Sequence, residues 1–458
     1  MDQRQTLLIL GASGDLTERY LLPSLGRLLQ AQPERRTRVV GSSRKDNPEW
    51  SQLVADGFAD YSGPAVESAL SDTEWVTADA TSADDWRRLL AQVEGRPVIY
   101  FALGAGVTRA ACEALREVEL PTGTRLVLEK PFGEDAESAA ELNELVTGLV
   151  GPDGVFRVDH FLAASAVRSM RALRFANRTI EAVWDGRHVA ELSVVWDEAL
   201  DLAGRADFYD DTGALRDMIQ SHLLHVLAAA IMPPEVAGDG DPLEAALASL
   251  RVAEGDGAVR RARWTAGEID GEPVEAYADQ EGVEPGRRTE TLAQVVLTSD
   301  LPQWQGVPLR LRSGKGLGED RRLLEVSFAD AESGAHGLRR PPDADRLRID
   351  ILTGAVELAL TSANPNDVGE AEPFLLRGSF YPPAVPGQPE HQASLDDVIA
   401  AADAEVYARV LQAALDGDES LSVTAANAVQ CWRLVAPALA AFAADEVPLE
   451  EYPAGSQG

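Results

Sequence analysis

The chain has 458 residues, of which 75 are acidic and 41 are basic, giving a formal net charge of −34 at neutral pH. A charge of this size and sign argues against nucleic acid or an anionic lipid surface as the main partner. The length predicts two domains. No apolar run reaches the ~18 residues of a membrane span and no basic leader with a cleavage site opens the sequence, so we expect a soluble, cytoplasmic protein.

Cysteine and lysine are both rare. Cys112 and Cys431 each lie in an apolar, helix-like stretch, so buried thiols are expected rather than a disulfide or a metal pair. The basic residues are almost all arginine, and the only lysines are Lys45, Lys130 and Lys315. Lysine supplies a compact, titratable point charge that arginine does not. These three positions therefore deserve a chemical interpretation.

Residues 1–160 alternate short apolar runs with helical patterns. The runs "TLLIL", "RVVG", "VIYFAL" and "RLVLE" begin at residues 6, 38, 98 and 125. Continuous apolar strands that alternate with helices are typical of a parallel sheet covered on both faces. The sequence therefore predicts a Rossmann-like, dinucleotide-binding domain over residues 1–160.

The first strand ends in a glycine-containing turn, "GASGDL". Gly11 and Gly14 would let backbone amides approach a pyrophosphate, and the helix that follows adds a favourable dipole. Ser13, Asp15 and Leu16 complete the candidate loop. The spacing is not the full G-x-G-x-x-G, so this turn alone leaves open both a dinucleotide site and an ordinary strand-to-helix connection.

The second strand ends in "GSSRKD" and offers Ser43, Arg44 and Lys45. An NAD enzyme usually places a carboxylate here for the ribose 2′-hydroxyl, whereas serine and cations suit a 2′-phosphate. NADP is therefore the expected cofactor. Asp46 keeps NAD possible, and a solvated basic turn is the alternative interpretation.

Two further strands of this domain end in charged residues. Lys130 precedes Pro131 at the end of "RLVLEK", and Asp159 and His160 end the run "FRVDH". In open parallel sheets the carboxyl ends of the strands line the ligand crevice. We expect these side chains at a binding site.

An apolar helical segment after residue 213 carries Asp217, His222 and His225. A histidine beside a carboxylate would be an oriented general base. The alternative is a core histidine, because a spacing of five places Asp217 and His222 slightly off one face of an α-helix. His222 and His225 offer too few ligands for a metal, and no metal site is expected.

Residues 161–458 have a different texture. Runs such as "AELSVVWDEA", "RLRIDILT" and "AVELALTS" are longer and partly alternate apolar with polar residues, which predicts a mostly antiparallel sheet with one buried face. Ser394 and Asp397 open a helical pattern that Gly417 could close. The expected fold is thus an α/β coenzyme domain followed by a larger α+β substrate domain over residues 161–458.

Six stretches, taken in order, resemble the glucose-6-phosphate dehydrogenase family from end to end: "GASGDL", "EKPFG", "RVDHFL", "GALRDMIQSHLL", "GVPLRLRSGKGL" and "PLEEYPAGSQG". The resemblance implies NADP-linked oxidation of C1 of an aldopyranose to a lactone, by default of glucose 6-phosphate, in the pentose phosphate pathway. It also implies homodimers or homotetramers that associate through the sheet of the second domain.

The resemblance also implies roles for single residues. His222 matches the family's base, which takes the proton of the C1 hydroxyl, and Asp159 matches the carboxylate that orients it. Residues matched to sugar-hydroxyl contacts are Lys130, Glu198 and Asp217, with Lys130 also near the cofactor. His160 and Lys315 match groups that contact the substrate phosphate.

The resemblance breaks at residues 161–165. The family usually has tyrosine, leucine, glycine, lysine and glutamate here, with the tyrosine and lysine on the phosphate, whereas this chain has Phe161, Leu162, Ala163, Ala164 and Ser165. A charge-assisted hydrogen bond contributes about 1.5 to 3 kcal/mol, so losing two contacts would weaken phosphate binding by roughly a hundredfold or more.

Two explanations stay open for this gap. Another cation could compensate: Arg168 would lie one helical turn after the lost lysine, and the further candidates are Arg171, Arg321 and Arg322. Alternatively, the substrate could be a sugar that lacks the phosphate or carries another group. A third hypothesis is an inactive NADP-binding paralogue with a regulatory role, against which the retained base and orienting carboxylate count.

Overall fold

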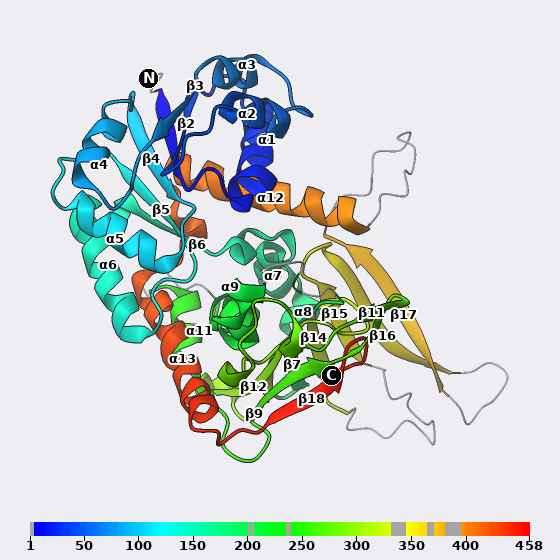
Figure 1. Ribbon diagram of the computed structural model, residues 1–458. Coiled ribbons are helices and arrows are strands. Elements are labelled where there is room, and N and C mark those ends of the chain that lie inside the picture. The colour runs from blue at the N-terminus through cyan, green and yellow to red at the C-terminus, as the bar shows by residue number, and fades with distance from the viewer. Residues whose placement is uncertain are drawn as a thin grey trace. The chain divides into compact units, whose positions relative to one another are not determined.

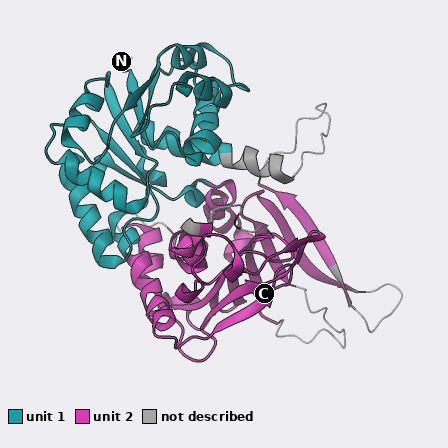
Figure 2. Ribbon diagram, in the orientation of Figure 1, with its two compact units in different colours: residues 1–163, 392–429 teal, residues 164–391, 430–458 magenta. Residues whose placement is uncertain are grey.

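The computed structural model describes residues 4–199, 202, 206–234, 240–330, 345–363, 371–380 and 395–458. The chain forms two compact units (Figures 1 and 2). Unit 1 contains residues 1–163 and 392–429, and unit 2 contains residues 164–391 and 430–458. The first division lies close to the boundary expected at residue 160. Residues 392–429, however, belong to unit 1, whereas the sequence predicts them in the second domain.

Unit 1 is built on a parallel sheet of six strands in the order β3-β2-β1-β4-β5-β6. The strands are β1 (Gln5–Leu10), β2 (Thr37–Ser43), β3 (Thr73–Thr77), β4 (Arg96–Phe101), β5 (Arg125–Glu129) and β6 (Val155–Val158). This order is that of a dinucleotide-binding fold, with the reversal between β1 and β4. The predicted Rossmann-like domain is confirmed.

Helices cover both faces of this sheet (Figure 1). They are η1 (Thr17–Leu21), α1 (Leu22–Ala31), α2 (Trp50–Gly57), α3 (Pro64–Ser71), α4 (Ala83–Leu90), α5 (Ala105–Leu115), α6 (Ala136–Val150) and α12 (Leu395–Asp416). Strand β1 is buried along its whole length, as a central parallel strand should be. Helix α12 comes from the far end of the sequence and packs on α1 and on the short 3-10 helix η3 (His160–Ala163).

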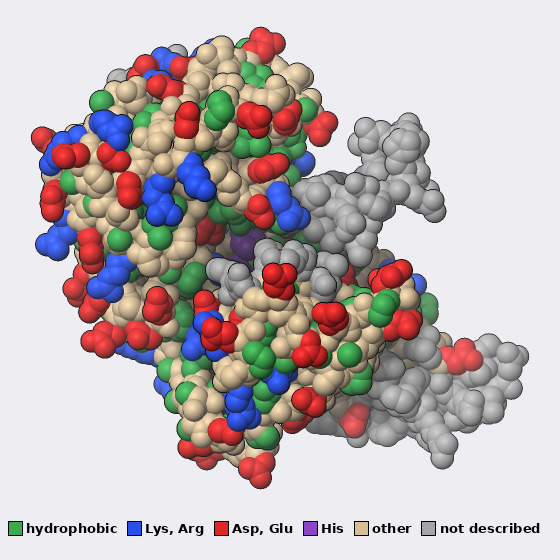
Figure 3. Space-filling view, in the orientation of Figure 1, with side chains coloured by type: hydrophobic (Ala, Val, Ile, Leu, Met, Phe, Trp, Pro, Cys, Tyr) green, Lys and Arg blue, Asp and Glu red, His purple; other side chains and the backbone are tan. Residues whose placement is uncertain are grey.

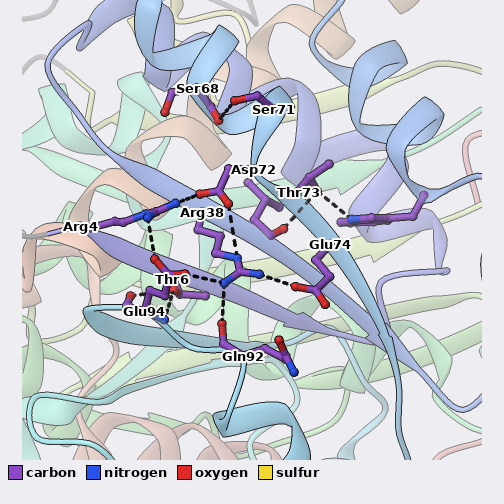
Figure 4. A network of polar contacts seen from close by, with 12 residues as sticks. Arg4, Thr6, Arg38, Ser68, Ser71, Asp72, Thr73, Glu74, Gln92 and Glu94 are labelled. Carbon is purple, nitrogen blue, oxygen red and sulfur yellow. Dashed lines mark hydrogen bonds and ion pairs between the residues drawn. The ribbon is translucent and has the colours of Figure 1, made fainter.

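A polar network ties the amino-terminal ends of the first strands together (Figure 4). Arg38 of β2 pairs with Glu74 of β3, donates to the carbonyl of Gln92 at 2.9 Å, and lies 3.2 Å from Glu94. Arg4 also pairs with Glu94, at 2.6 Å. These ion pairs lie at the edge of the sheet opposite the strand ends where ligands are expected, which leaves that other edge for binding.

Unit 2 contains a ten-stranded sheet in the order β17-β16-β15-β14-β7-β13-β12-β9-β18, with β8 also paired to β12. The strands are β7 (Val189–Asp197), β8 (Leu250–Val252), β9 (Val259–Thr265), β12 (Leu292–Ser299), β13 (Leu309–Gly314), β14 (Arg321–Phe328), β15 (Arg346–Asp350), β16 (Ala355–Ala363), β17 (Ala371–Ser379) and β18 (Leu449–Pro453). All pairs are antiparallel except β7 with β13 and β9 with β18. The predicted, mostly antiparallel sheet is confirmed.

The helices of unit 2 complete its core. They are α7 (Ser165–Phe175), α8 (Arg178–Glu181), α9 (Ala206–Asp210), the π-helix η4 (Leu215–Leu223), α10 (Leu224–Ile231), α11 (Pro242–Ser249) and most of α13 (Ala425–Ala443), with a small hairpin of β10 (Gly267–Ile269) and β11 (Glu272–Val274). Cys112 and Cys431 are free, buried thiols, as expected. In the part of the chain that the structure describes, no helix is long and apolar enough to cross a membrane.

Candidate functional site

The turn after β1 depends on a glycine. Gly11 has a φ of 73°, and a Cβ at this position would lie 2.2 Å from the carbonyl oxygen of Ala102, at the end of β4. The amides of Gly11 and Ala12 donate to the carbonyl of Ser42 at 2.9 and 3.1 Å. The chain then enters a helical segment at Asp15. The turn is therefore held tightly against the ends of β2 and β4, with the following helix starting beside it.

A cavity of about 620 Å³ opens at the carboxyl ends of β1, β2 and β3. It is lined by Leu10, Gly11, Ser13, Ser42, Ser43, Arg44, Lys45, Ala78, Asp79, Ala80, Thr81, Leu103 and Val107. The structure thus brings together five of the predicted cofactor residues, and Gly14, Asp15 and Leu16 continue the same turn. The glycine cradle and the exposed cations fit the phosphates of a dinucleotide.

Asp79 lines this cavity together with Arg44 and Lys45, and it is not among the site residues that the sequence predicts. It accepts hydrogen bonds from the amide and hydroxyl of Thr81 at 2.9 and 2.7 Å. These bonds, with a smaller contribution from the charge of Arg44, lower the pKa of Asp79, so its carboxylate stays ionised. The available signal was its place just beyond β3, in "TADATS".

A half-buried glutamate lies beside Lys130 at the end of β5. Glu129 accepts a hydrogen bond from the hydroxyl of Tyr100 on β4. Burial raises the pKa of Glu129 to about 7, against the opposing effects of the Tyr100 hydrogen bond and the Lys130 charge. Burial and the Glu129 charge also raise the pKa of Tyr100. Glu129 is a second residue that sequence reasoning passed over, although it is the acid of "EKPFG".

The Asp159–His160 pair ends β6. Asp159 is fully buried, and its Oδ1 accepts from the backbone amide of Phe161 at 3.1 Å. The His160 ring lies 5.1 Å from the ring of Phe161 and 5.2 Å from the ring of Tyr407 on α12. Lys130, Asp159 and His160 therefore occupy the ends of two adjacent strands, as the sequence predicts.

In unit 2, Asp217 and His222 lie in the π-helix η4. The backbone of a π-helix bonds residues five apart, so its turn is wider than that of an α-helix. A spacing of five therefore places Asp217 and His222 closer to one face than the α-helical expectation did. His222 is only 1% exposed and Asp217 is half-buried.

Glu198 and Lys315 form an ion pair with each other in unit 2, and both side chains are largely buried. The backbone supports this pair: the amide of Lys315 donates to Thr291 at 2.9 Å, and the amide of Leu317 donates to the carbonyl of Glu198 at 3.1 Å. Lys315 also lies 5.7 Å from the ring of Tyr209. An anion at Lys315 must therefore share the ammonium group with a carboxylate.

The four arginines considered for the lost phosphate contacts differ in their surroundings. Arg321 pairs with the buried Asp197, while Arg322 pairs with Asp320 at 3.1 Å and stacks on Trp196. Arg171 lines a separate cavity of about 400 Å³ with Phe175 and Met232. The amide of Arg168 donates to the carbonyl of Ala164 at 3.0 Å, which confirms the helical turn, and its side chain is exposed.

The predicted residues thus form two groups, one in each unit. Unit 1 holds the cofactor residues with Lys130, Asp159 and His160, and unit 2 holds Glu198, Asp217, His222 and Lys315 with Arg168. Figure 3 shows acidic side chains spread over the visible face of both units instead of gathered in one patch. Binding of a dianion must therefore depend on local cations.

Two family models match the chain. "Glucose-6-phosphate dehydrogenase, NAD binding domain" matches residues 8–169, and "Glucose-6-phosphate dehydrogenase, C-terminal domain" matches residues 171–458. The chain is 33% identical to the glucose-6-phosphate 1-dehydrogenase of Gluconobacter oxydans over 98% of this chain and 93% of that protein. It is 31% identical to glucose-6-phosphate 1-dehydrogenase 2 of Mycobacterium tuberculosis over 99% of this chain and 91% of that protein.

Solved structures show the same fold. A glucose-6-phosphate dehydrogenase in complex with its substrate glucose 6-phosphate superposes with a TM-score of 0.83 at 24% identity, covering 100% of this chain and 96% of the other. The glucose-6-phosphate 1-dehydrogenase of Mycobacterium avium gives a TM-score of 0.80 at 25% identity, covering 100% and 95%.

Glu129 makes a testable contribution to the pH dependence of stability. Its folded-state pKa of about 7 exceeds the usual 4.5, so between these pH values the folded protein retains a proton that the unfolded chain releases. Stability should fall as pH rises through this window, by on the order of 3 kcal/mol. Glu129→Gln should lack this loss of stability. The difference in melting temperature, Glu129→Gln minus wild type, should therefore increase from pH 5 to pH 8. Glu144→Gln, at an exposed position of α6, is the control; parallel wild-type and Glu129→Gln curves would contradict the assignment.

Proposed function

The chain belongs to the glucose-6-phosphate dehydrogenase family, and we propose that it oxidises C1 of glucose 6-phosphate to the lactone with hydride transfer to NADP. The observation that carries this proposal is the match of the two family models to residues 8–169 and 171–458, which together cover nearly the whole chain. The base, its carboxylate and the sugar contacts are assigned to single residues from the motifs of the sequence. None of the comparisons supports a different sugar or an inactive paralogue.

The residues divide the chemistry between them. The imidazole of His222 takes the proton of the C1 hydroxyl as the C1–H bond breaks, and Asp159 is assigned from the family motif as the carboxylate that orients this imidazole and stabilises its charge. Lys130, Glu198 and Asp217 hold sugar hydroxyls, and His160 and Lys315 bind the phosphate. The nicotinamide of the bound cofactor supplies the hydride acceptor.

NADP is the proposed cofactor because of the cavity at the end of β2. Ser43, Arg44 and Lys45 line it, and both cations are exposed. Asp79, in the same cavity, is an ionised carboxylate that opposes a 2′-phosphate, so the preference for NADP over NAD rests on Arg44 and Lys45 outweighing it.

We also propose a homodimer or homotetramer that associates through the sheet of unit 2. Three large apolar side chains, Phe374, Leu375 and Leu376, are 39–49% exposed on the edge strand β17. Exposed apolar side chains on an edge strand favour a protein partner, and a second copy of the chain is the partner that the family resemblance implies. The free thiols of both cysteines are consistent with a cytoplasmic setting, which we propose as well.

The base assignment predicts the behaviour of His222→Asn. This variant should bind NADPH with wild-type affinity but lose turnover by about 10²- to 10⁴-fold, since a positioned general base contributes that much. Steady-state rates and a fluorescence titration of NADPH measure the two properties. His188→Asn, at an exposed position in the same unit, is the matched control. Near-normal turnover of His222→Asn would remove this residue from the mechanism.

The substrate assignment predicts a preference for the phosphorylated sugar. The value of kcat/KM should be at least about 100-fold higher for glucose 6-phosphate than for glucose, and the advantage should shrink as ionic strength rises, because charge-assisted contacts are screened by salt. Equal values for the two sugars would instead mark residues 161–165 as a changed pocket. Turnover of neither sugar together with tight NADPH binding would favour the inactive paralogue.

The cofactor assignment predicts the effect of Arg44→Ala. Losing a charge-assisted bond to the 2′-phosphate should weaken NADPH binding about 10- to 100-fold and change NADH binding by less than about threefold. Arg116→Ala, which removes an arginine of the same unit outside this cavity, should change neither affinity. Equal losses for NADPH and NADH would show that Arg44 does not read the 2′-phosphate.

A further inference from the structure

Helix α12 packs against residues 160–163, which include part of the segment where the chain differs from the family pattern. The 3-10 helix η3, from His160 to Ala163, follows β6, and α12 packs against it within unit 1. The two segments are far apart in sequence: Tyr407 and His160 are separated by 247 positions. Two side chains of α12 contact opposite ends of η3, and they set its position in different ways.

At the start of η3, Tyr407 contacts His160 through its ring and through its hydroxyl. The two rings are stacked, with centroids 5.2 Å apart and planes inclined by 24°. The Tyr407 hydroxyl lies 3.4 Å from Nδ1 of His160. Tyr407 is only 5% exposed and lies 5.5 Å from the ring of Tyr20, so it has little freedom to move away.

At the end of η3, Arg409 holds the backbone. Its Nη1 donates to the carbonyl oxygen of Ala163 at 2.8 Å, and its Nη2 pairs with Glu405 one turn back along α12. This carbonyl immediately precedes Ala164, where the family has its phosphate-binding lysine. The segment from His160 to Ala163 is therefore fixed at both ends by one helix.

The hydroxyl contact has a chemical consequence for His160. When the Tyr407 hydroxyl donates to Nδ1 of a neutral imidazole, the ring proton sits on Nε2; when the imidazole is charged, both nitrogens carry protons. In both states Nε2 is a donor, which is what an anionic ligand requires. Phe161 stands where the family has its phosphate-binding tyrosine. Its ring centroid lies 5.1 Å from that of His160, but it has no hydroxyl to offer.

We propose that Tyr407 is a positioning residue that holds His160 in orientation and tautomer for the substrate phosphate. This inference rests on the proposed role of His160 in phosphate binding. It also explains how a site without the family's tyrosine and lysine at positions 161 and 164 retains an ordered phosphate contact: the order comes from α12 rather than from the local segment.

The test is the variant Tyr407→Phe, which keeps the stacked ring and removes the hydroxyl. A neutral hydrogen bond contributes about 0.5 to 1.5 kcal/mol, so KM for glucose 6-phosphate should rise about 3- to 10-fold with kcat within twofold of wild type. The value of kcat/KM for glucose and the affinity for NADPH should not change, because neither depends on the proposed contact between His160 and the phosphate of glucose 6-phosphate. Tyr407→Leu, which also removes the stacked ring, should raise KM further. Tyr61→Phe, in the same unit, is the matched control.

A double-variant cycle separates this inference from the function on which it rests. His160→Asn should raise KM for glucose 6-phosphate, and adding Tyr407→Phe to it should cause no further rise, because the hydroxyl then has no ring to orient. If His160→Asn leaves KM unchanged, the phosphate role of His160 fails and the inference fails with it. If His160→Asn raises KM but Tyr407→Phe does not, only the inference is overturned. Equal effects of Tyr407→Phe on both sugars and on NADPH would show a general structural role and would also overturn it.

Discussion

The parallel pairing of the strands in unit 1 is the constraint on which the candidate site depends. Parallel strands place all their carboxyl ends at one edge of the sheet, so residues far apart in sequence become neighbours there. This edge holds the glycine turn after β1, the cations after β2, Asp79 after β3, Glu129 and Lys130 at the end of β5, and Asp159 and His160 after β6. The ion pairs of Arg38 and Arg4 lie at the opposite edge, where they stabilise the sheet without competing for a ligand.

The overall charge of the chain is −34, so any attraction for an anionic ligand must come from cations close to that ligand. Each of these candidate cations has an acidic neighbour within its own unit: Lys315 pairs with Glu198 in unit 2, and in unit 1 Arg44 lies near Asp79 and Lys130 near Glu129. An anion bound by any one of these cations must therefore share it with an acidic group. Such an arrangement weakens binding relative to bare cations but avoids leaving charges unpaired and buried when no ligand is bound.

Both sheets and the candidate residues at the strand ends can be predicted from the sequence. The features that cannot be predicted have physical reasons for it. Apolar periodicity predicted both sheets, and the residues at strand ends were found because a parallel sheet has only one ligand edge. Glu129 was missed because its raised pKa depends on burial and on contacts with residues such as Tyr100 of a neighbouring strand, and Asp79 because its place beside Arg44 depends on the pairing of β2 with β3. A linear pattern contains neither. The sequence predicts an α-helix at Asp217 and His222 and the structure has a π-helix there, because the apolar pattern of the 9 residues of η4 is too short to distinguish the two periodicities.

The segment 392–429 shows most clearly where a linear interpretation of the chain ends. Its helical pattern was visible in the sequence, but its position in unit 1 depends on packing against α1 and η3, residues more than 200 positions earlier. Because α12 supplies Tyr407 and Arg409 to the segment after β6, the geometry of a short loop is determined by a distant helix. Local substitutions such as Phe161 and Ala164 can then accumulate without releasing His160, since the contacts that hold it are made elsewhere in the chain.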